Sequence, residues 1–385
     1  MKLPPLSLYM HLPWCVKKCP YCDFNSHTAA NGAPTDRYVR ALLQDLATEA
    51  PHAKGRRIES VFMGGGTPSL FSPEEIAQLL DGVRANFDVV EDVEITMEAN
   101  PGTVEYGSPA GYREAGVTRL SIGAQSFDDA TLRSLGRIHT SDDIVRAVEN
   151  IRAGGFTNFN IDLMHGLPEQ TVDKSQADLA AAIALGPTHL SWYQLTLEPN
   201  TVFHARPPAN LPNEELAFDI YERGQSLLAA SGYRQYEISA YARDGRTCRH
   251  NLNYWSFGDY LAVGAGAHGK LTTDKGVFRY QKPANPQQYM LNEESGLVMA
   301  PLNAVPEHDL VFEFMLNSLR LNAGFHESMF VERTGLTRSA LEKAATGALR
   351  KKLLMRTEDG VWRPTELGAR FLNDLQAEFV PERRH

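Results

Sequence analysis

Three of the four cysteines lie in one short segment, Cys15-Val-Lys-Lys-Cys19-Pro-Tyr-Cys22. Thiolates grouped this closely are ligands for a soft metal centre. A zinc site normally takes four ligands in two paired halves, and the chain offers no second half. Three cysteines instead fit a 4Fe-4S cluster whose fourth iron stays open to a small molecule. We therefore expect Cys15, Cys19 and Cys22 to bind a single 4Fe-4S cluster.

Further polar or glycine-rich positions stand at the ends of predicted strands. The segment 64–68, Gly-Gly-Gly-Thr-Pro, can bring its backbone close to a ligand and offer unpaired N–H groups, although such triplets are often only tight turns. Glu98, Gln125 and Asp162 stand at or near the ends of three other predicted strands. Taken singly, each is equally well read as a surface ion pair or a hydrogen bond at the sheet rim. Because parallel strands end at one edge, we expect these residues to converge on a single mouth.

The elements that must position these residues form a repeating pattern of β-rich runs and helical stretches. The predicted strands are Leu6–Leu12, Ser60–Gly64, Val93–Ala99, Arg119–Gln125, Asn158–Gly166 and His189–Leu197. Helix-start signals stand between or after them, at Ser72-Pro73-Glu74-Glu75, Ser141-Asp142-Asp143 and Asn213-Glu214-Glu215. Six βα units predict an α/β fold built on a partial (βα)6 barrel of the TIM type, although a doubly wound sheet gives the same pattern.

The pattern changes in the last third of the chain. We expect residues 1–240 to form the barrel core and residues 241–305 a connector, irregular over Arg246–Gly269, which is rich in Gly, His and aromatic residues. Residues 306–385 predict a winged-helix-like domain. Its expected elements are a helix over Pro306–Leu321, a helix over Thr337–Leu354, a hairpin over Met355–Arg363 and a helix over Thr365–Phe379.

Composition limits the classes of function. The chain has 385 residues, 43% of them hydrophobic, and a formal net charge of −9, which argues against a general affinity for nucleic acid. No apolar stretch is long enough for a membrane span, and residues 1–5 contain no apolar signal region. We expect a cytoplasmic protein without a transmembrane segment.

The cysteine spacing and several later segments resemble a known family. C-x-x-x-C-x-x-C after the first strand is similar to the signature of the radical S-adenosylmethionine (SAM) family. Glu-Ala-Asn-Pro at 98–101, Gly-x-Gln-Ser-Phe at 123–127, Leu-Gly-Arg-x-His at 135–139 and Asp-Leu-Met-x-Gly-Leu-Pro at 162–168 resemble its HemN-like branch. The resemblance covers nearly the whole chain. It implies that SAM chelates the open iron and is cleaved to a 5′-deoxyadenosyl radical after electron transfer.

The resemblance also implies roles for individual residues. Tyr21 is the aromatic residue placed against the cofactor, and the glycine-rich segment matches the part that holds the methionyl end of SAM. The implied SAM-binding residues are Tyr9, Gly65 and Glu98 for a first SAM, Gln125, Arg137 and Asp162 for a second SAM, and Tyr21, Gly66 and Thr67 beside them.

Two functions exist within this branch. Oxygen-independent coproporphyrinogen III dehydrogenase, also called an oxidase, carries a further Cys where Phe24 stands, and it has an N-terminal extension that this sequence is not expected to have. The segment 250–255, His-Asn-x-x-Tyr-Trp, instead resembles the haem chaperones of the branch. His250 offers an axial nitrogen for haem iron, unless it is a structural histidine, and Tyr254 and Trp255 offer flat apolar surface. Cys248 is either an alternative ligand or a small buried thiol.

We therefore expect a haem chaperone that binds a 4Fe-4S cluster, SAM and haem as cargo. Its expected partners are haem-accepting proteins, membrane respiratory enzymes among them, and an electron donor such as flavodoxin or ferredoxin. We assign no catalytic residue and leave open whether SAM is cleaved. The alternatives are the dehydrogenase and a DNA-binding regulator, whose only charge support is Arg350-Lys351-Lys352.

Overall fold

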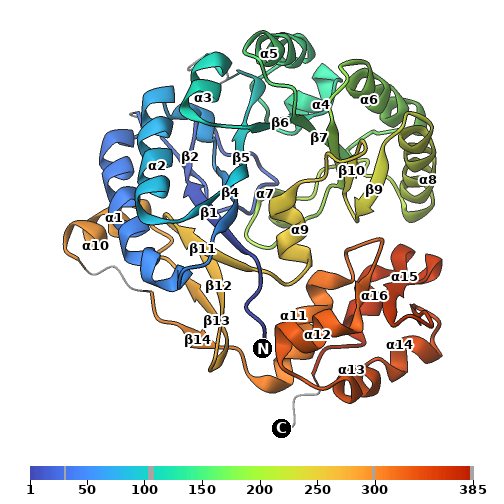
Figure 1. Ribbon diagram of the computed structural model, residues 1–385. Coiled ribbons are helices and arrows are strands. Elements are labelled where there is room, and N and C mark those ends of the chain that lie inside the picture. Colours follow the sequence, from blue (N-terminus) through green and yellow to red (C-terminus); the bar gives the residue numbers. More distant parts are fainter. Residues whose placement is uncertain (30–31, 103–107, 297–299, 382–385) are drawn as a thin grey trace.

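The computed structural model describes residues 1–29, 32–102, 108–296 and 300–381, and its centre is a twelve-stranded sheet that curves into an open barrel (Figure 1). Six parallel strands follow one another across it in chain order: β1 (Leu6–Leu12), β4 (Ile58–Gly65), β5 (Val89–Ala99), β6 (Arg119–Gln125), β7 (Phe159–His165) and β8 (His189–Gln194). Each strand is added on the same side of the one before. A doubly wound sheet would reverse this order at a switch point, so the partial-barrel prediction is confirmed.

The two faces of the parallel strands differ in chemistry. Alternate residues such as Leu8, Met63 and Ile122 are fully buried in the main hydrophobic core. The residues between them, such as Ser60, Ser121 and Asn160, are polar and bond to polar side chains of neighbouring strands. Because successive strand side chains point to opposite faces, the barrel has an apolar outside under the helices and a polar inside.

An outer layer of helices covers the apolar face of the barrel (Figure 1). Its members are α1 (Thr35–Ala53), α2 (Pro73–Asn86), α3 (Pro109–Ala115), α5 (Ser141–Ala153), α6 (Val172–Ala184) and α8 (Glu214–Ala230). Ser72 and Glu75 form the capping box of α2, and Asn213 caps α8, as predicted. Helix α5 begins at Ser141 as predicted, but its cap is Thr140. Three shorter helices complete this half of the chain: a 3-10 helix at Pro68–Leu70, α4 (Asp129–Ser134) and α7 (Val202–Ala205).

The expectation of an irregular stretch over Arg246–Gly269 is wrong. This stretch contains helix α9 (Arg249–Trp255), strand β11 (Asp259–Val263) and the start of β12 (His268–Thr273). Strand β11 pairs in parallel with β1 and becomes a seventh parallel strand. Its short length and flanking glycines concealed it, because its stability comes from pairing with a strand 250 residues earlier rather than from a local pattern.

Antiparallel strands extend the sheet at both ends. Beyond β11 lie β12, β13 (Gly276–Gln281) and β14 (Asn303–Ala304), and beyond β8 lie β10 (Ala240–Ala242) and β9 (Arg234–Glu237). The sheet order ends at β14 and β9, which are not paired with each other, so the barrel stays open. Helix α10 (Pro286–Glu294) packs against α1.

The C-terminal part forms a second hydrophobic core beside the barrel. Its elements are α11 (Glu307–Ser318), β15 (Phe325–His326), α12 (Glu327–Thr334), α13 (Arg338–Ala344), α14 (Thr346–Arg350), β16 (Leu354–Arg356), β17 (Val361–Pro364), α15 (Glu366–Arg370) and α16 (Leu372–Ala377). Strands β15, β17 and β16 form a small sheet, which gives the winged-helix-like arrangement. The two helices expected over Thr337–Leu354 and Thr365–Phe379 are each broken in two, at Ala345 and Phe371. None of the helices in the described ranges is long and apolar enough to cross a membrane.

Candidate functional site

The three clustered cysteines lie in a loop at the carboxyl ends of the barrel strands. The loop begins at β2 (Trp14–Cys15) and closes at β3 (His27–Thr28), which pairs with β2. Two hydrogen-bond donors approach the sulfur atoms from outside the loop: Thr67 Oγ1 lies 3.6 Å from Cys15 Sγ, and Arg137 Nη1 lies 3.6 Å from Cys19 Sγ. All three thiols are partly buried and border one cavity of about 240 Å³, called the inner cavity below.

This geometry fits a polynuclear cluster better than a single ion. Across the described ranges, no three His, Cys, Asp or Glu side chains are grouped as ligands of one ion would be. A cluster does not require such convergence, since each thiolate binds a different iron. Burial raises the pKa of Cys15 and Cys22, so both are thiols until a metal displaces the proton. The donors at Thr67 and Arg137 are suited to stabilise sulfur that carries negative charge.

The residues implied for SAM are brought together around the inner cavity, except Tyr9, which lines the neighbouring larger cavity. Strand ends and the cysteine loop both contribute to its lining, which includes Tyr21, Gly65, Gly66, Thr67, Glu98, Gln125, Arg137 and Asp162. Gln125 has a left-handed backbone with φ of +71° and accepts a hydrogen bond from Tyr193 Oη at 2.7 Å. Tyr21 packs on Phe203. The structure thus places in one cavity residues that are up to 141 positions apart in the chain.

The prediction that the glycine-rich segment offers free N–H groups is wrong at Gly65, Gly66 and Thr67. Gly65 N donates to Glu98 Oε2, Gly66 N to Leu12 O and Thr67 N to Trp14 O. These glycines are needed for close packing instead: a Cβ on Gly65 would lie 2.3 Å from the His11 ring, and one on Gly66 would lie 2.5 Å from Trp14 O. The segment therefore packs β4 against the cysteine loop while its backbone borders the cavity.

Two carboxylates give the inner cavity its electrostatic character. Burial, and then the charge of Asp162, raise the pKa of Glu98 to about 7, although the hydrogen bond from Gly65 N acts in the opposite direction. Burial likewise raises the pKa of Asp162, although Ser121 and Asn160 donate to it. Within the described ranges neither carboxylate forms an ion pair, and of the two only Asp162 has its raised pKa counteracted by a nearby cation, Arg119. A cationic ligand such as SAM, which carries a sulfonium and an ammonium group, would relieve this repulsion.

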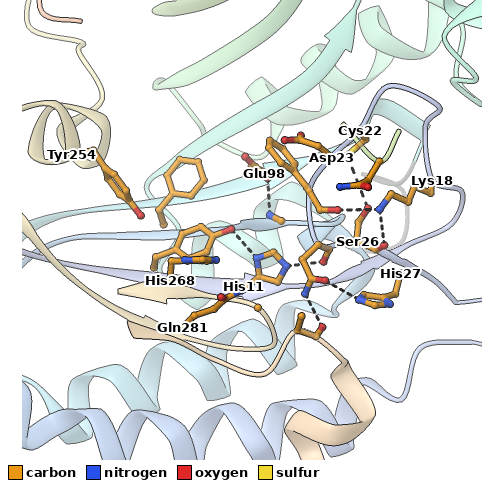
Figure 2. A pocket seen from close by; sticks show the side chains of 18 of the residues that line it. His11, Lys18, Cys22, Asp23, Ser26, His27, Glu98, Tyr254, His268 and Gln281 are labelled. Carbon is orange, nitrogen blue, oxygen red and sulfur yellow. Dashed lines mark hydrogen bonds between the residues drawn. The ribbon is translucent and has the colours of Figure 1, made fainter. Parts of the chain in front are cut away.

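A larger cavity of about 790 Å³, the outer cavity, adjoins the inner one. Cys22, Phe24, Ser26, Gly65 and Glu98 line both. Figure 2 shows Tyr254 at one end of this cavity and Lys18 and Cys22 at the other, with His11 between them. Aromatic rings from β1, β4 and α9 form one wall, namely those of Tyr9, Phe62, Tyr254 and Trp255.

His250 lies within this aromatic wall. Its ring is 5.1 Å from that of Phe62 and 5.2 Å from that of Tyr254. Nδ1 bonds to Ser60 Oγ at 3.1 Å, whereas Nε2 is buried without a partner. Burial lowers the pKa of His250 to about 3, so the imidazole is neutral. A neutral imidazole held at one nitrogen and unsatisfied at the other is the usual state of a metal-ligating histidine.

The other candidate ligand, Cys248, is not at either cavity. It is fully buried at the start of α9, where its thiol lies 3.5 Å from Glu94 Oε1. Burial raises its pKa to about 12. Glu94 also accepts from the Arg249 N–H and so caps the helix that carries His250. The structure thus supports the buried-thiol interpretation of Cys248.

Comparison with known proteins agrees with this geometry. The radical SAM superfamily model matches residues 9–179. The chain is 48% identical to the heme chaperone HemW of Haemophilus influenzae, over 99% of both chains, and 48% identical to the heme chaperone HemW of Escherichia coli, over 99% of this chain and all of the relative. The chain belongs to the HemW family. This HemW-family chain also resembles the solved structure of coproporphyrinogen III oxidase (HemN) from E. coli, with a TM-score of 0.82, 25% identity and coverage of 98% of this chain and 90% of the other.

Sequence reasoning missed several residues that shape the site of this HemW-family protein. Asn25 fixes the cysteine loop, because its Nδ2 donates to Ala265 O at 2.9 Å and to Ala284 O at 2.8 Å. Asn100 donates to Thr67 Oγ1 and so supports the residue that contacts Cys15. Asn100 lies in the Glu-Ala-Asn-Pro segment, a signal that was available in the sequence. No local signal marked Asn25, whose backbone partners are 240 and 259 residues away.

In this HemW-family structure Arg137 contacts the cysteine loop directly, which allows a first prediction. Besides Cys19 Sγ, it donates to Gly123 O and Asn100 Oδ1. In the Arg137→Lys protein, we expect the reduction potential of the cluster to fall, because the donor to Cys19 sulfur stabilises the reduced form. A contact stronger by about 1.4 kcal/mol in the reduced form corresponds to about 59 mV for one electron. An EPR-monitored redox titration measures this shift.

Arg133→Lys is the matched control. Arg133 is an exposed arginine of α4, four residues away, and it does not line the inner cavity. The control should keep the wild-type potential. If Arg137→Lys also keeps it, while the iron content is unchanged, the contact with Cys19 does not tune the cluster.

Proposed function

We propose that this protein is a haem chaperone of the radical SAM type. In this proposal, Cys15, Cys19 and Cys22 hold a 4Fe-4S cluster, the inner cavity holds SAM and the outer cavity holds haem as cargo. Membership of the HemW family supports this assignment, since close relatives carry the name heme chaperone. The observation that carries it is the outer cavity itself, an aromatic chamber whose wall contains a neutral imidazole, that of His250, with no hydrogen-bond partner at Nε2.

The outer cavity suits a flat, apolar ligand that contains iron. Its volume of about 790 Å³ lies within the range of roughly 300–1,000 Å³ that is common for ligand pockets. Rings of Tyr9, Phe62 and Tyr254 offer flat surface to a porphyrin. In the tautomer with its proton on Nδ1, His250 donates to Ser60 and keeps the Nε2 lone pair for iron. Lys18, a residue of the cysteine loop that lines the cavity, has an ammonium group held by Phe24 O and Ser26 O and is suited to a propionate.

The inner cavity suits SAM by charge and by position. Glu98 is placed to hold a cationic or hydroxylated group, with Asp162 and Gln125 beside it. Tyr9 lines the outer cavity, where it bonds to His11 and packs on Phe62. In this proposal it lies between bound SAM and bound haem. When bound, the cluster and SAM would supply one-electron chemistry at the open iron. The residues of this chain orient that ligand and separate it from the larger chamber.

The cellular setting belongs to the same proposal. The protein would work in the cytoplasm, take electrons from a flavodoxin or ferredoxin, and deliver haem to haem-accepting proteins such as membrane respiratory enzymes. Delivery needs a cargo site that opens to solvent, and the outer cavity meets this need because exposed residues such as Asp23 and Phe24 stand in its lining.

Coproporphyrinogen III decarboxylation is the second candidate function, because the fold matches that of HemN along nearly the whole chain. Phe24 separates the two candidates. It occupies the position of a further cysteine in the dehydrogenase, it is 56% exposed, and it lines both cavities. A phenyl ring in this place adds apolar surface for haem and removes the chemistry of a thiol.

Haem titration beside an anaerobic activity assay tests the proposed function. The purified protein with reconstituted cluster should bind haem stably and should form no protoporphyrinogen IX from coproporphyrinogen III, SAM and reductant. In the His250→Ala protein, we expect the haem spectrum to change and affinity to fall roughly tenfold or more, which is about 1.4 kcal/mol. Iron and sulfide content should stay at the wild-type level, because His250 lies outside the inner cavity that the three cysteines border.

The outcomes separate the alternatives. If the His250→Ala protein gave the same haem spectrum as the wild-type protein, only the assignment of His250 as an iron ligand would be wrong. Robust decarboxylation coupled to SAM turnover would show that the protein is a coproporphyrinogen enzyme, and the chaperone proposal would fall.

A further inference from the structure

The outer cavity contains a second histidine that its aromatic wall does not cover. Resting on the proposed function, we propose that His268 is an iron ligand of haem at the open side of the outer cavity, where cargo enters and leaves. The imidazole of His268 would form a coordinate bond to iron, and a ligand of the acceptor protein would replace that bond on delivery.

A survey of the imidazoles that line the outer cavity singles out His268. His11 is bonded at both nitrogens, to Tyr9 Oη at 3.0 Å and to Asn25 O at 2.9 Å. His27 bonds to Asn25 Oδ1 at 3.1 Å. His250 is bonded at Nδ1, and its Nε2 is shielded from solvent. In the described part of the chain, no hydrogen bond or ion pair engages the imidazole of His268, and its side chain is exposed.

His268 stands in a different element from His250. It is the first residue of β12, and Gln281 of β13, its partner across the strand pair, also lines the cavity. His250 approaches from α9 on the aromatic side. Figure 2 places His268 next to His11 and Gln281 and at a distance from the cysteine loop with Cys22 and Lys18. A haem that reaches the cavity from solvent therefore meets the exposed imidazole before the buried one.

The surroundings keep His268 in a state that can bind iron. Burial of part of the ring and the nearby Arg279 guanidinium lower its pKa, so the neutral imidazole with a free lone pair prevails at neutral pH. The turn that leads to β12 is fixed, because Asn25 bonds to Ala265 and Gly264 N donates to the buried Asp45 carboxylate at 3.1 Å. The backbone before His268 is thus held in place, while the His268 imidazole can rotate.

Parallel titrations with haem and with metal-free protoporphyrin IX test the proposal. In the His268→Ala protein, haem affinity should fall roughly tenfold or more and the visible spectrum should change. Binding of protoporphyrin IX should be unchanged, because that ligand makes the same ring contacts but has no iron to coordinate. Added imidazole should restore the haem spectrum of the variant. A packing role for His268 would alter both titrations alike and would not respond to imidazole.

His308→Ala serves as the matched control, since His308 is an exposed histidine of α11 that does not line the cavity. It should behave as wild type in both titrations. If His268→Ala binds haem with wild-type affinity and spectrum, the ligand proposal is overturned while the haem chaperone function stands. If the wild-type protein itself binds neither haem nor protoporphyrin IX, the proposed function fails, and the two failures are thereby distinguished.

Discussion

Replacing Cys19 by serine is expected to abolish the iron–sulfur cluster. A serine hydroxyl does not supply the thiolate that iron requires, and the loop offers no spare cysteine, because Cys248 is buried beside Glu94 outside both cavities. We expect nearly all iron, sulfide and visible absorption to be lost after anaerobic reconstitution. The fold should persist, since the side chain is only partly buried and the loop is fixed at both ends by β2 and β3.

Cys248→Ser is the matched control for this experiment. It makes the same chemical change at the fourth cysteine and should leave the cluster content at the wild-type level. Iron and sulfide assays together with circular dichroism measure both outcomes. A Cys19→Ser protein that keeps a full cluster would contradict the assignment of the three ligands.

Glu98→Gln should weaken SAM binding strongly and, at the same time, stabilise the empty protein at alkaline pH. The pKa of Glu98 is raised from its ordinary 4.5 to about 7, first by burial and then by Asp162. Such a group adds stability while it is protonated, and this contribution is lost as pH rises through about 7. At pH 8 the variant avoids the buried charge, so we expect it to be roughly 1 kcal/mol more stable, or about 1 °C in Tm for a chain of 385 residues. At pH 5 the difference should vanish.

SAM affinity should move in the opposite direction. The wild-type protein should bind SAM more tightly as pH rises from 6 to 8 and Glu98 ionises, whereas Glu98→Gln should bind roughly tenfold more weakly at pH 8 and lose this dependence. Calorimetry with the reconstituted protein measures affinity, and thermal melts of the empty protein measure stability. Glu91→Gln is the control, because Glu91 is exposed on the same strand. A pH-independent wild-type affinity would exclude Glu98 as the group that meets the cation.

The parallel core was predictable because its signal is local. Leu6–Leu12 and Arg119–Gln125 were predicted to the residue, since each is a run of apolar and β-forming residues between loop residues. Strand β11 was not predictable in this way. It has five residues between Gly258 and Gly264, and its partner β1 lies at the other end of the chain. Non-local pairing leaves little trace in a sequence of this length.

Residues of the candidate site were likewise predictable only where their signal is local in the sequence. Cys15, Cys19 and Cys22 share one loop, so their spacing carried the prediction. His268 and Ser60 became interesting only when the fold placed one beside the outer cavity and the other behind His250. Arg137 was expected to face SAM, and its contacts with Cys19, Gly123 and Asn100 show a role in fixing the loop that no motif indicated.

The side chain of Asn25 ties the cysteine loop to two segments at the outer cavity, the turn at Ala265 before β12 and the bend at Ala284 after β13. Under the proposed function, the loop that would hold the oxygen-sensitive cluster and the entrance for haem therefore share one support. Damage to the loop would be transmitted to the entrance without any change in the barrel behind it. Under the proposed function, only a protein molecule with an intact cysteine loop would therefore offer haem a well-formed entrance to the outer cavity.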